Sequence, residues 1–223
     1  MEIILTGCDD KTAWQVPFFV KSIRTHNPSA ELILADFGLS EENLEKFSHL
    51  FDGVFYVDSD AKGWFKKPLA ILEASQIVGV TKVCWLDTDC QVTADISDIF
   101  KLSTPQTLGM VEDRPWTARR PQLGKWYNSG CVLVEGAPQI LKLWAKQCVT
   151  NPTQGDQEVL HMMMDGDEIK KIRFINPLPH TYNTLRLDYI DNIAVKNPKV
   201  IHHTGDKGNA VLSEIMKQSN EEK

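Results

Sequence analysis

The chain has 223 residues, of which 42% are hydrophobic and 24% are charged, and its formal net charge is −6. This length fits one domain with a sizeable core, and the acidic balance excludes the global basic surface of a nucleic-acid-binding protein. No apolar run reaches the length of a membrane span, and the acidic start of the chain lacks the basic region of a signal peptide. The five cysteines are dispersed and form no C-x-x-C pair, so we expect reduced thiols and a cytoplasmic protein.

Strands and helices alternate over the first ninety residues. Short apolar runs predict four strands, in "EIILTG", "ELILADFG", "GVFYVDS" and "KVCWLD". Apolar residues at helical spacing predict three helices, in "WQVPFFVKSIRTHNP", "SEENLEKFSHLF" and "KPLAILEASQIV". Pro28 closes the first helix, and Ser40 is the expected N-cap of the second. The alternation favours βαβ units, and therefore an α/β fold with a mostly parallel central sheet.

The second half is less regular. We expect strands in "TLGMVED", "SGCVLVEG", "KIRFIN" and "KVIHHTG", and helices in "PQILKLWAKQCVT" and "GDQEVLHMMM". Between the first two of these strands, prolines at 115 and 121 predict that residues 113–127 form a loop. Because no internal repeat and no clear linker interrupts the chain, we expect a single domain over residues 1–223.

An Asp-x-Asp pair stands at the end of the fourth predicted strand. In an open α/β sheet, ligands bind at the carboxyl ends of the strands, and this is where Asp87 and Asp89 lie. A spacing of two puts both carboxylates on one side of an extended chain, and hard divalent cations prefer such oxygen ligands. A solvated turn after a strand explains the pair equally well, so the rest of the sequence must decide.

Two metal-linked alternatives fit poorly. A calcium loop of the EF-hand type needs Gly at its sixth position and a helix before it, whereas here the sixth position is Val92 and a strand precedes. Phosphatases that form an aspartyl phosphate carry the pair near the N-terminus and Thr or Val two residues after it. Here the pair lies in mid-chain and is followed by Gln91 in that position. The remaining alternative is a nucleotide-sugar transferase, in which a metal links the carboxylates to a diphosphate.

Several segments resemble, in order, the motifs of glycogenin-like retaining glycosyltransferases (family 8-like), which have the GT-A fold. The resembling segments are "TGCDD", "LSEENLEKF", "LDTDCQVTADISDIF", "WYNSGCVLVEG", "GDQEVL" and "VIHHTGDK". They cover most of the chain. The resemblance implies a single GT-A domain with a mixed, mostly parallel central sheet flanked by helices. Within it, residues 1–90 would form the nucleotide-binding half and residues 91–223 the half that binds the donor sugar and the acceptor.

The resemblance also implies a metal site. Its ligands would be Asp87, Asp89 and His202, with His202 preferred over its neighbour because Gly205 fixes the register of the motif. Two carboxylates and an imidazole suit Mn²⁺ or Mg²⁺, and the imidazole favours Mn²⁺. Lys207 would bind the diphosphate, although the family loop has one more residue before its Lys and continues Pro-Trp, where this chain reads "GDKGNA".

Further site residues follow from the same resemblance. The nucleotide would be held by the end of the first strand and the turn after it, at Thr6, Gly7, Asp9 and Asp10. The donor sugar or its phosphates would be bound by Lys67, Thr88, Asn128, Ser129 and Gly205. Asp156 and Gln157 would lie at a helix start close to the transferred sugar and take part in catalysis, although an Asp before a helix is also an ordinary N-cap.

The resemblance therefore predicts a metal-dependent retaining glycosyltransferase that transfers a hexose from a UDP-sugar to an unknown carbohydrate or protein acceptor. Two alternatives remain. One is a non-catalytic protein that binds a nucleotide sugar. The other is a sugar-phosphate nucleotidyltransferase, although "ILTGCDDKTAW" lacks the Gly-rich loop that such enzymes have after their first strand. Residues 113–127, with Trp116, Arg119 and Arg120, are expected to be an acceptor-facing loop that is mobile without ligand.

Overall fold

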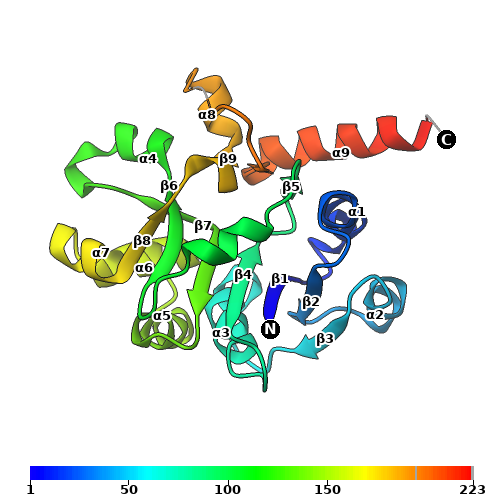
Figure 1. The fold of residues 1–223 in the computed structure, drawn as a ribbon, viewed down its shortest axis with the longest axis horizontal. Helices are drawn as coiled ribbons and strands as arrows, with labels where there is room; N and C mark the ends of the chain where they lie inside the picture. Colours follow the sequence, from blue (N-terminus) through cyan, green and yellow to red (C-terminus); the bar gives the residue numbers. More distant parts are fainter. Residues whose placement is uncertain (194, 222–223) are drawn as a thin grey trace.

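The computed structural model describes residues 1–193 and 195–221. A seven-stranded mixed sheet forms the centre of the molecule (Figure 1). Its strand order is β3-β2-β1-β4-β7-β6-β8, and a separate three-stranded sheet has the order β5-β10-β9. The strands are β1 Glu2–Cys8, β2 Glu31–Asp36, β3 Gly53–Tyr56, β4 Lys82–Leu86, β5 Cys90–Val92, β6 Leu108–Glu112, β7 Tyr127–Glu135, β8 Ile175–Leu178, β9 Thr184–Leu185 and β10 Val200–His202.

The helices flank this sheet. They are α1 Val16–His26, α2 Glu41–Ser48, α3 Lys67–Ala74, α4 Arg114–Arg119, α5 Gln139–Thr150, α6 Asp156–Met164, α7 Glu168–Phe174, α8 Arg186–Ile190 and α9 Gly205–Glu221. Short 3-10 helices lie at Ala13–Gln15, Gly63–Lys66, Ser97–Leu102, Pro121–Leu123 and His180–Tyr182. Figure 1 shows α9 extending away from the sheet to the end of the chain. Within the described residues, no helix is long and apolar enough to cross a membrane.

The parallel part of the sheet is built by the first ninety residues, as the alternating sequence pattern predicts. β1 pairs in parallel with β2 and with β4, and β2 pairs in parallel with β3. β7 then pairs antiparallel with both β4 and β6, and β8 adds a parallel edge strand. The fold is therefore α/β with a mixed, mostly parallel sheet, which confirms the predicted fold class.

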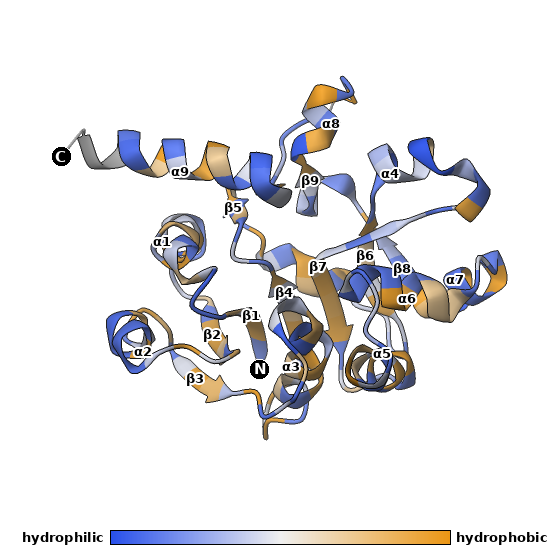
Figure 2. Cartoon of the chain, turned by 180° about the vertical axis from the view of Figure 1, so that it is seen from behind, coloured by the Kyte–Doolittle hydropathy of each residue, from blue (hydrophilic) through white to orange (hydrophobic). Residues whose placement is uncertain are grey.

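Two apolar layers enclose the sheet, because successive residues of a strand point to opposite faces. Ile3 and Trp85 lie in one core cluster with residues of α3, α5 and α6. Ile4 and Cys84 lie in the other cluster with residues of α1 and α2. Figure 2 shows the hydrophobic colours gathered on central strands such as β7. All five cysteines of the chain are buried and free.

The predicted N-terminal half is confirmed closely. Ser40 accepts a hydrogen bond from the backbone N–H of Asn43 and caps α2, and the two acids of the first turn favour the same helix end. In the second half, the strand predicted in "KIRFIN" is partly wrong, because α7 runs to Phe174 and β8 begins only at Ile175. The Asp167 side chain accepts from two backbone N–H groups and starts α7 there.

The loop predicted over residues 113–127 is also wrong, because its first part is the helix α4. Pro115 falls in the first turn of α4, where a missing N–H costs nothing because that group has no partner inside the helix. The Asp113 side chain accepts from the Trp116 N–H and caps the helix at 3.0 Å. Pro115 was expected to exclude a helix, whereas it lies in the first turn of one.

Candidate active site

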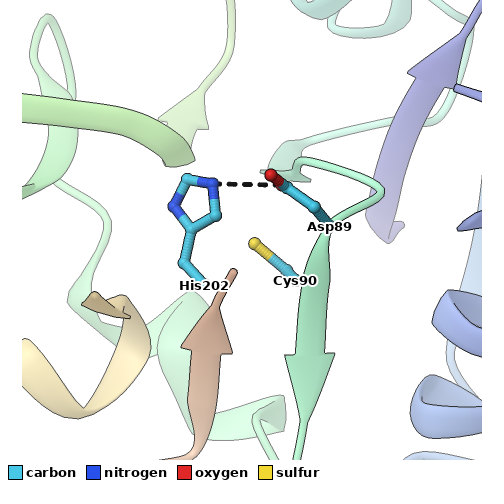
Figure 3. Close-up of side chains that lie close together, drawn as sticks. All are labelled: Asp89, Cys90 and His202. Atoms are coloured by element: carbon cyan, nitrogen blue, oxygen red, sulfur yellow. Dashed lines mark ion pairs between the residues drawn. The ribbon is translucent and has the colours of Figure 1, made fainter. Parts of the chain in front are cut away.

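The small sheet brings the Asp-x-Asp pair to the C-terminal histidine. β5 and β10 pair antiparallel with His202 opposite Cys90, and the His203 N–H donates to the Asp89 carbonyl at 3.0 Å. As a result, His202 Nε2 lies 3.1 Å from Asp89 Oδ1 (Figure 3). It also lies 3.8 Å from Asp87 Oδ2, so the imidazole is near both carboxylates after the carboxyl end of β4.

A chain of side-chain hydrogen bonds fixes which nitrogen of His202 faces the carboxylates. The Gly130 N–H donates to Asn128 Oδ1 at 2.9 Å, so this atom is an acceptor. Asn183 Nδ2 also donates to Asn128 Oδ1, at 2.8 Å, which leaves Asn183 Oδ1 3.0 Å from His202 Nδ1. Since an amide oxygen only accepts, Nδ1 carries the proton, and Nε2 presents its lone pair to the carboxylates.

This arrangement fits a divalent cation. With its proton on Nδ1, His202 directs a lone pair at Asp89 Oδ1, which is buried and has no hydrogen-bond donor. Two facing lone pairs require either a second proton on the imidazole or a cation between them. Burial disfavours the charged imidazole, but the carboxylates of Asp89 and Asp87 outweigh this and raise the pKa of His202. A cation bound here would take the place of that proton.

Cys90 lies beside this pair, and its sulfur belongs to the same compact group of possible ligand atoms (Figure 3). Burial, followed by the charge of Asp89, raises the pKa of the Cys90 thiol well above its ordinary value. The protonated thiol donates to the Gly130 carbonyl at 3.6 Å. Cys90 is therefore a wall of the site, whereas the oxygen and imidazole atoms are the ligands that a hard cation prefers.

Gly130 leaves the space that the imidazole fills. A Cβ added at Gly130 would collide with the ring of His202, so a residue with any side chain would push the imidazole away from the carboxylates. Asn128, Ser129 and Gly130 all lie on the buried central strand β7. Two residues of the "NSG" segment thus help to orient His202. Asn128 binds Asn183, which contacts the imidazole, and Gly130 leaves room for the ring.

Lys67 links two of the predicted acids. Its Nζ lies 2.9 Å from Asp87 Oδ1 and 3.3 Å from Asp156 Oδ2, and it also donates to the carbonyl and hydroxyl of Ser129, at 3.2 and 3.3 Å. Burial alone would lower the pKa of this ammonium, but Asp156 and Asp87 raise it, so Lys67 stays charged. Trp85 Nε1 donates to Asp87 Oδ1 at 2.6 Å and holds the carboxylate from the other side.

Asp156 and Gln157 start α6 beside β7, where the sequence placed them. Asp156 is buried, and its pKa is raised first by desolvation, with Lys67 opposing this and the Asp87 charge adding to it. Gln157 Oε1 accepts from the Ser129 N–H at 3.0 Å, which anchors the helix start on the strand. Lys67 therefore links the Asp156 carboxylate to Asp87, and the Gln157 amide binds the backbone of β7 beside it.

The predicted nucleotide residues occupy the end of β1 and the turn after it. Thr6 is fully buried, and its hydroxyl has no hydrogen-bond partner within the described residues. Gly7 pairs with Ala35 of β2. Asp9 accepts from the N–H groups of two following residues and forms a local turn. Thr6 and Gly7 lie at the carboxyl end of a strand beside β4, as a ligand site at this edge requires.

Asp10 is placed differently. Its Oδ1 accepts from the Ser40 N–H at 2.8 Å, from the Ser40 hydroxyl at 3.1 Å and from Asn43 Nδ2 at 2.8 Å. The Asn43 amide, followed by Ser40, lowers the pKa of this exposed carboxyl. All three contacts support the start of α2, so the structure gives Asp10 a structural role in the unliganded chain.

The segment expected to be a phosphate loop is the first turn of α9, which begins at Gly205. A Cβ at Gly208 would collide with the His203 carbonyl, so glycine allows this turn to pack against the end of β10. The side-chain amide of Gln15 joins α9 to Thr88. Its Nε2 donates to Asn209 Oδ1, and its Oε1 accepts from the Thr88 hydroxyl at 2.5 Å. Lys207 is exposed. The predicted residues Thr88, Gly205 and Lys207 therefore belong to one connected edge of the site.

The segment 113–127 carries fewer free groups than expected. Arg119 forms an ion pair with Asp191 at 2.9 Å, and Arg120 lies over the ring of Trp116 at 4.1 Å. Trp126 is buried and stacks on His161 with ring centroids 3.6 Å apart. The aromatic residues of this segment pack mainly under α4. Its contact with an acceptor and its mobility stay predictions.

Three residues that support the site were not expected from the sequence. Asn183 and Gln15 each link two distant segments by hydrogen bonds, and Arg186 follows β9 beside the end of β10. An isolated polar residue forms no sequence motif, so its position in the chain does not predict such a role. The signal that does exist is positional, since Asn183 and Arg186 both lie shortly before the predicted ligand His202 in the sequence.

No protein-family model matches the sequence, and no curated protein matches it. The fold, however, is shared with solved glycosyltransferases. The galactosyltransferase LgtC, solved with donor and acceptor sugar analogs, matches at a TM-score of 0.66 and 17% identity, over 92% of this chain and 88% of that one. GlyE from Streptococcus pneumoniae TIGR4 matches at 0.63 and 18% identity, over 98% of this chain and 64% of that one.

Mouse xyloside xylosyltransferase 1 matches at a TM-score of 0.58 and 13% identity, over 92% of this chain and 98% of that one. At these identities the likeness concerns the fold. The chain therefore has the GT-A-like fold of these glycosyltransferases, which agrees with the family resemblance seen in the sequence. The activity of the chain has to be argued from its own residues.

Proposed function

We propose that this protein is a metal-dependent retaining glycosyltransferase that transfers a hexose from a UDP-sugar to an acceptor hydroxyl. One observation carries the proposal. Asp87, Asp89 and His202 converge at the carboxyl end of β4, and Lys67 ties the first of them to the Asp156 carboxylate. On a GT-A-like fold, this set combines a divalent-cation site with a buried acid next to it.

The chain's own residues would bind and orient the donor. Asp87, Asp89 and His202 would hold Mn²⁺ or Mg²⁺, and the imidazole favours Mn²⁺. When bound, the metal supplies Lewis-acid stabilisation of the departing diphosphate. Thr6 and Gly7 offer polar groups to the base or ribose from the end of β1.

Asp156 is the residue closest to the expected reaction centre. Lys67 offsets the desolvation that raises the pKa of this carboxyl, and the lysine itself remains protonated because two acids surround it. A carboxylate at this point stabilises positive charge that develops on a sugar ring, or attacks its anomeric carbon. Lys67 therefore opposes the rise in the pKa of Asp156 and contributes to the lowered pKa of Asp87.

Binding calorimetry tests the metal-dependent part. UDP is expected to bind much more tightly with Mn²⁺ than with EDTA, and Asp89→Asn is expected to remove this difference. Asp95→Asn is the matched control, since that exposed carboxylate accepts from the Ser97 N–H and is not among the predicted site residues, so its loss should leave the metal effect intact. Equal affinity with and without Mn²⁺ in the unmodified protein would contradict the proposal.

Product analysis tests the transfer itself. With a panel of UDP-α-sugars, an α-linked product in the proton NMR spectrum of a fresh reaction is expected, because the proposed class retains configuration. Asp156→Ala should lower turnover far more than UDP affinity. Metal-dependent binding without any turnover or hydrolysis of any donor would favour the alternative of a nucleotide-sugar binding protein.

A further inference from the structure

The small sheet aligns three strand ends, and the third carries an arginine. Its order is β5-β10-β9, so the strand with His202 lies between the strand that follows Asp89 and the strand that ends at Leu185. β9 and β10 are parallel, and Leu185 pairs with His202. Arg186 is the next residue and the first of α8, so it directly follows the strand end that pairs with His202. The same edge thus presents a metal ligand and a guanidinium-bearing residue.

Arg186 differs from the other arginines in its surroundings. Each of the other five forms an ion pair or lies over an aromatic ring: Arg24, Arg114, Arg119, Arg120 and Arg173. Among the side chains that the structure describes, in residues 1–193 and 195–218, no acid, ring or hydrogen-bond acceptor meets the side chain of Arg186. Its Nε is fully buried and unpaired although the side chain is only half-buried. A buried donor without an acceptor is costly, so this one is poised for an acceptor from outside the chain.

The charges around the metal position favour an anion as that acceptor. Two carboxylates and a neutral imidazole would just neutralise a divalent cation, and Lys67 is matched by Asp156. The negative charge of a bound phosphate would then need further cations at this edge. A planar guanidinium matches phosphate oxygens with two parallel hydrogen bonds, which an ammonium group cannot do.

We propose that Arg186 binds a phosphate oxyanion beside the metal position. The inference rests on the proposed function and extends it by one residue. The oxyanion comes either from the diphosphate of the donor or from a phosphate group on the acceptor, and these two sources share the same chemistry. Arg186 would therefore set either donor affinity or the choice of a phosphorylated acceptor.

Calorimetry on the full chain separates the two sources. The variants are Arg186→Met, which removes the charge, and Arg186→Lys, which keeps the charge but not the planar fork. Arg173→Met is the control, because that exposed arginine lies over the ring of Phe174 and is not among the predicted site residues. The probes are uridine and UDP in the presence of Mn²⁺, and inorganic phosphate added to protein saturated with UDP and Mg²⁺. A thermal melt of each variant verifies that it is folded, and Arg186→Lys serves if Arg186→Met is not.

Loss of UDP affinity on the order of tenfold or more in Arg186→Met, with uridine binding unchanged and with wild-type UDP affinity in Arg173→Met, supports the donor as the source. Unchanged UDP affinity with loss of phosphate binding supports the acceptor. Wild-type binding of both UDP and phosphate in the folded Arg186 variants overturns the inference, as does a wild-type protein that binds neither. If wild-type protein binds phosphate through Arg186 but shows no metal-dependent UDP binding, the proposed function fails while the inference stands.

Discussion

Replacing Asn183 by Leu should weaken metal binding without touching any metal ligand. Asn183 is fully buried, accepts from His202 Nδ1 and donates to Asn128 Oδ1. Leucine has a similar volume and offers neither group. The imidazole then loses the hydrogen bond that keeps the proton on Nδ1 and Nε2 free for the cation.

The structure allows the size of both effects to be worked out. Loss of two buried hydrogen bonds at about 1 kcal/mol each, together with about 1–3 kcal/mol for one buried N–H left without an acceptor, should lower the free energy of unfolding by roughly 3–5 kcal/mol. Loss of the group that orients a ligating histidine typically costs about 10–100-fold in metal affinity. Asn27→Leu is the matched control, because Asn27 is also buried and makes two hydrogen bonds, to the Ala94 carbonyl and from the Ile96 N–H, neither of which involves a predicted site residue.

Two measurements check this prediction. Electron paramagnetic resonance of free Mn²⁺ gives the affinity, and ¹⁵N NMR of histidine-labelled protein gives the tautomer of His202. Asn183→Leu should lose affinity and show a changed tautomer, whereas Asn27→Leu should lose stability only. If Asn183→Leu keeps both the affinity and the Nδ1–H tautomer, the reasoning from the hydrogen-bond chain is wrong.

Three further predictions concern stability. Lys67→Met leaves the buried Asp156 carboxylate unpaired and should lower the free energy of unfolding by about 3–5 kcal/mol in urea melts at pH 7, a loss that should shrink at low pH as the acid protonates. Burial lowers the pKa of His161 to about 3, so wild-type stability should fall by up to about 1.4 kcal/mol per unit as pH drops from 6.5 toward 3, and urea melts of His161→Gln should lack this part of the slope. Gly208→Ala should displace the first turn of α9, because its Cβ meets the His203 carbonyl, and circular dichroism should show a lower melting temperature; an unchanged one would contradict the packing.

The first ninety residues could be predicted almost element by element, because their apolar periods are short, regular and bounded by caps and breakers. α2 is an example, since Ser40, the acids after it and the apolar spacing all indicate the same helix. The second half was harder because local signals there have two meanings. Pro115 begins α4 where it was expected to break the chain, and Gly205 begins α9 where a loop was expected.

Only those residues of the candidate site that belong to sequence motifs could be predicted. The ligands and the α6 start were placed by the order of short segments, and the structure brings them together. The residues that orient those groups could not be found in this way. Asn183 acts on His202 through an amide oxygen whose direction depends on Asn128 and on a backbone N–H of Gly130. Such a chain of hydrogen bonds exists only after three strands have met.

Lys67 gives the site a property that none of its motifs contains. A cation that binds Asp87 competes with Lys67 for the same carboxylate, since the ammonium already lies 2.9 and 3.1 Å from its two oxygens. Lys67 also forms an ion pair with Asp156. If a cation displaced the ammonium from Asp87, the ammonium would interact more strongly with the Asp156 carboxylate. If the proposed cation binds Asp87, Lys67 would be left with Asp156 as its main carboxylate partner, and the ionised form of that acid would be favoured. Under the proposed function, metal occupancy and the charge of the adjacent acid would therefore be coupled through one buried lysine.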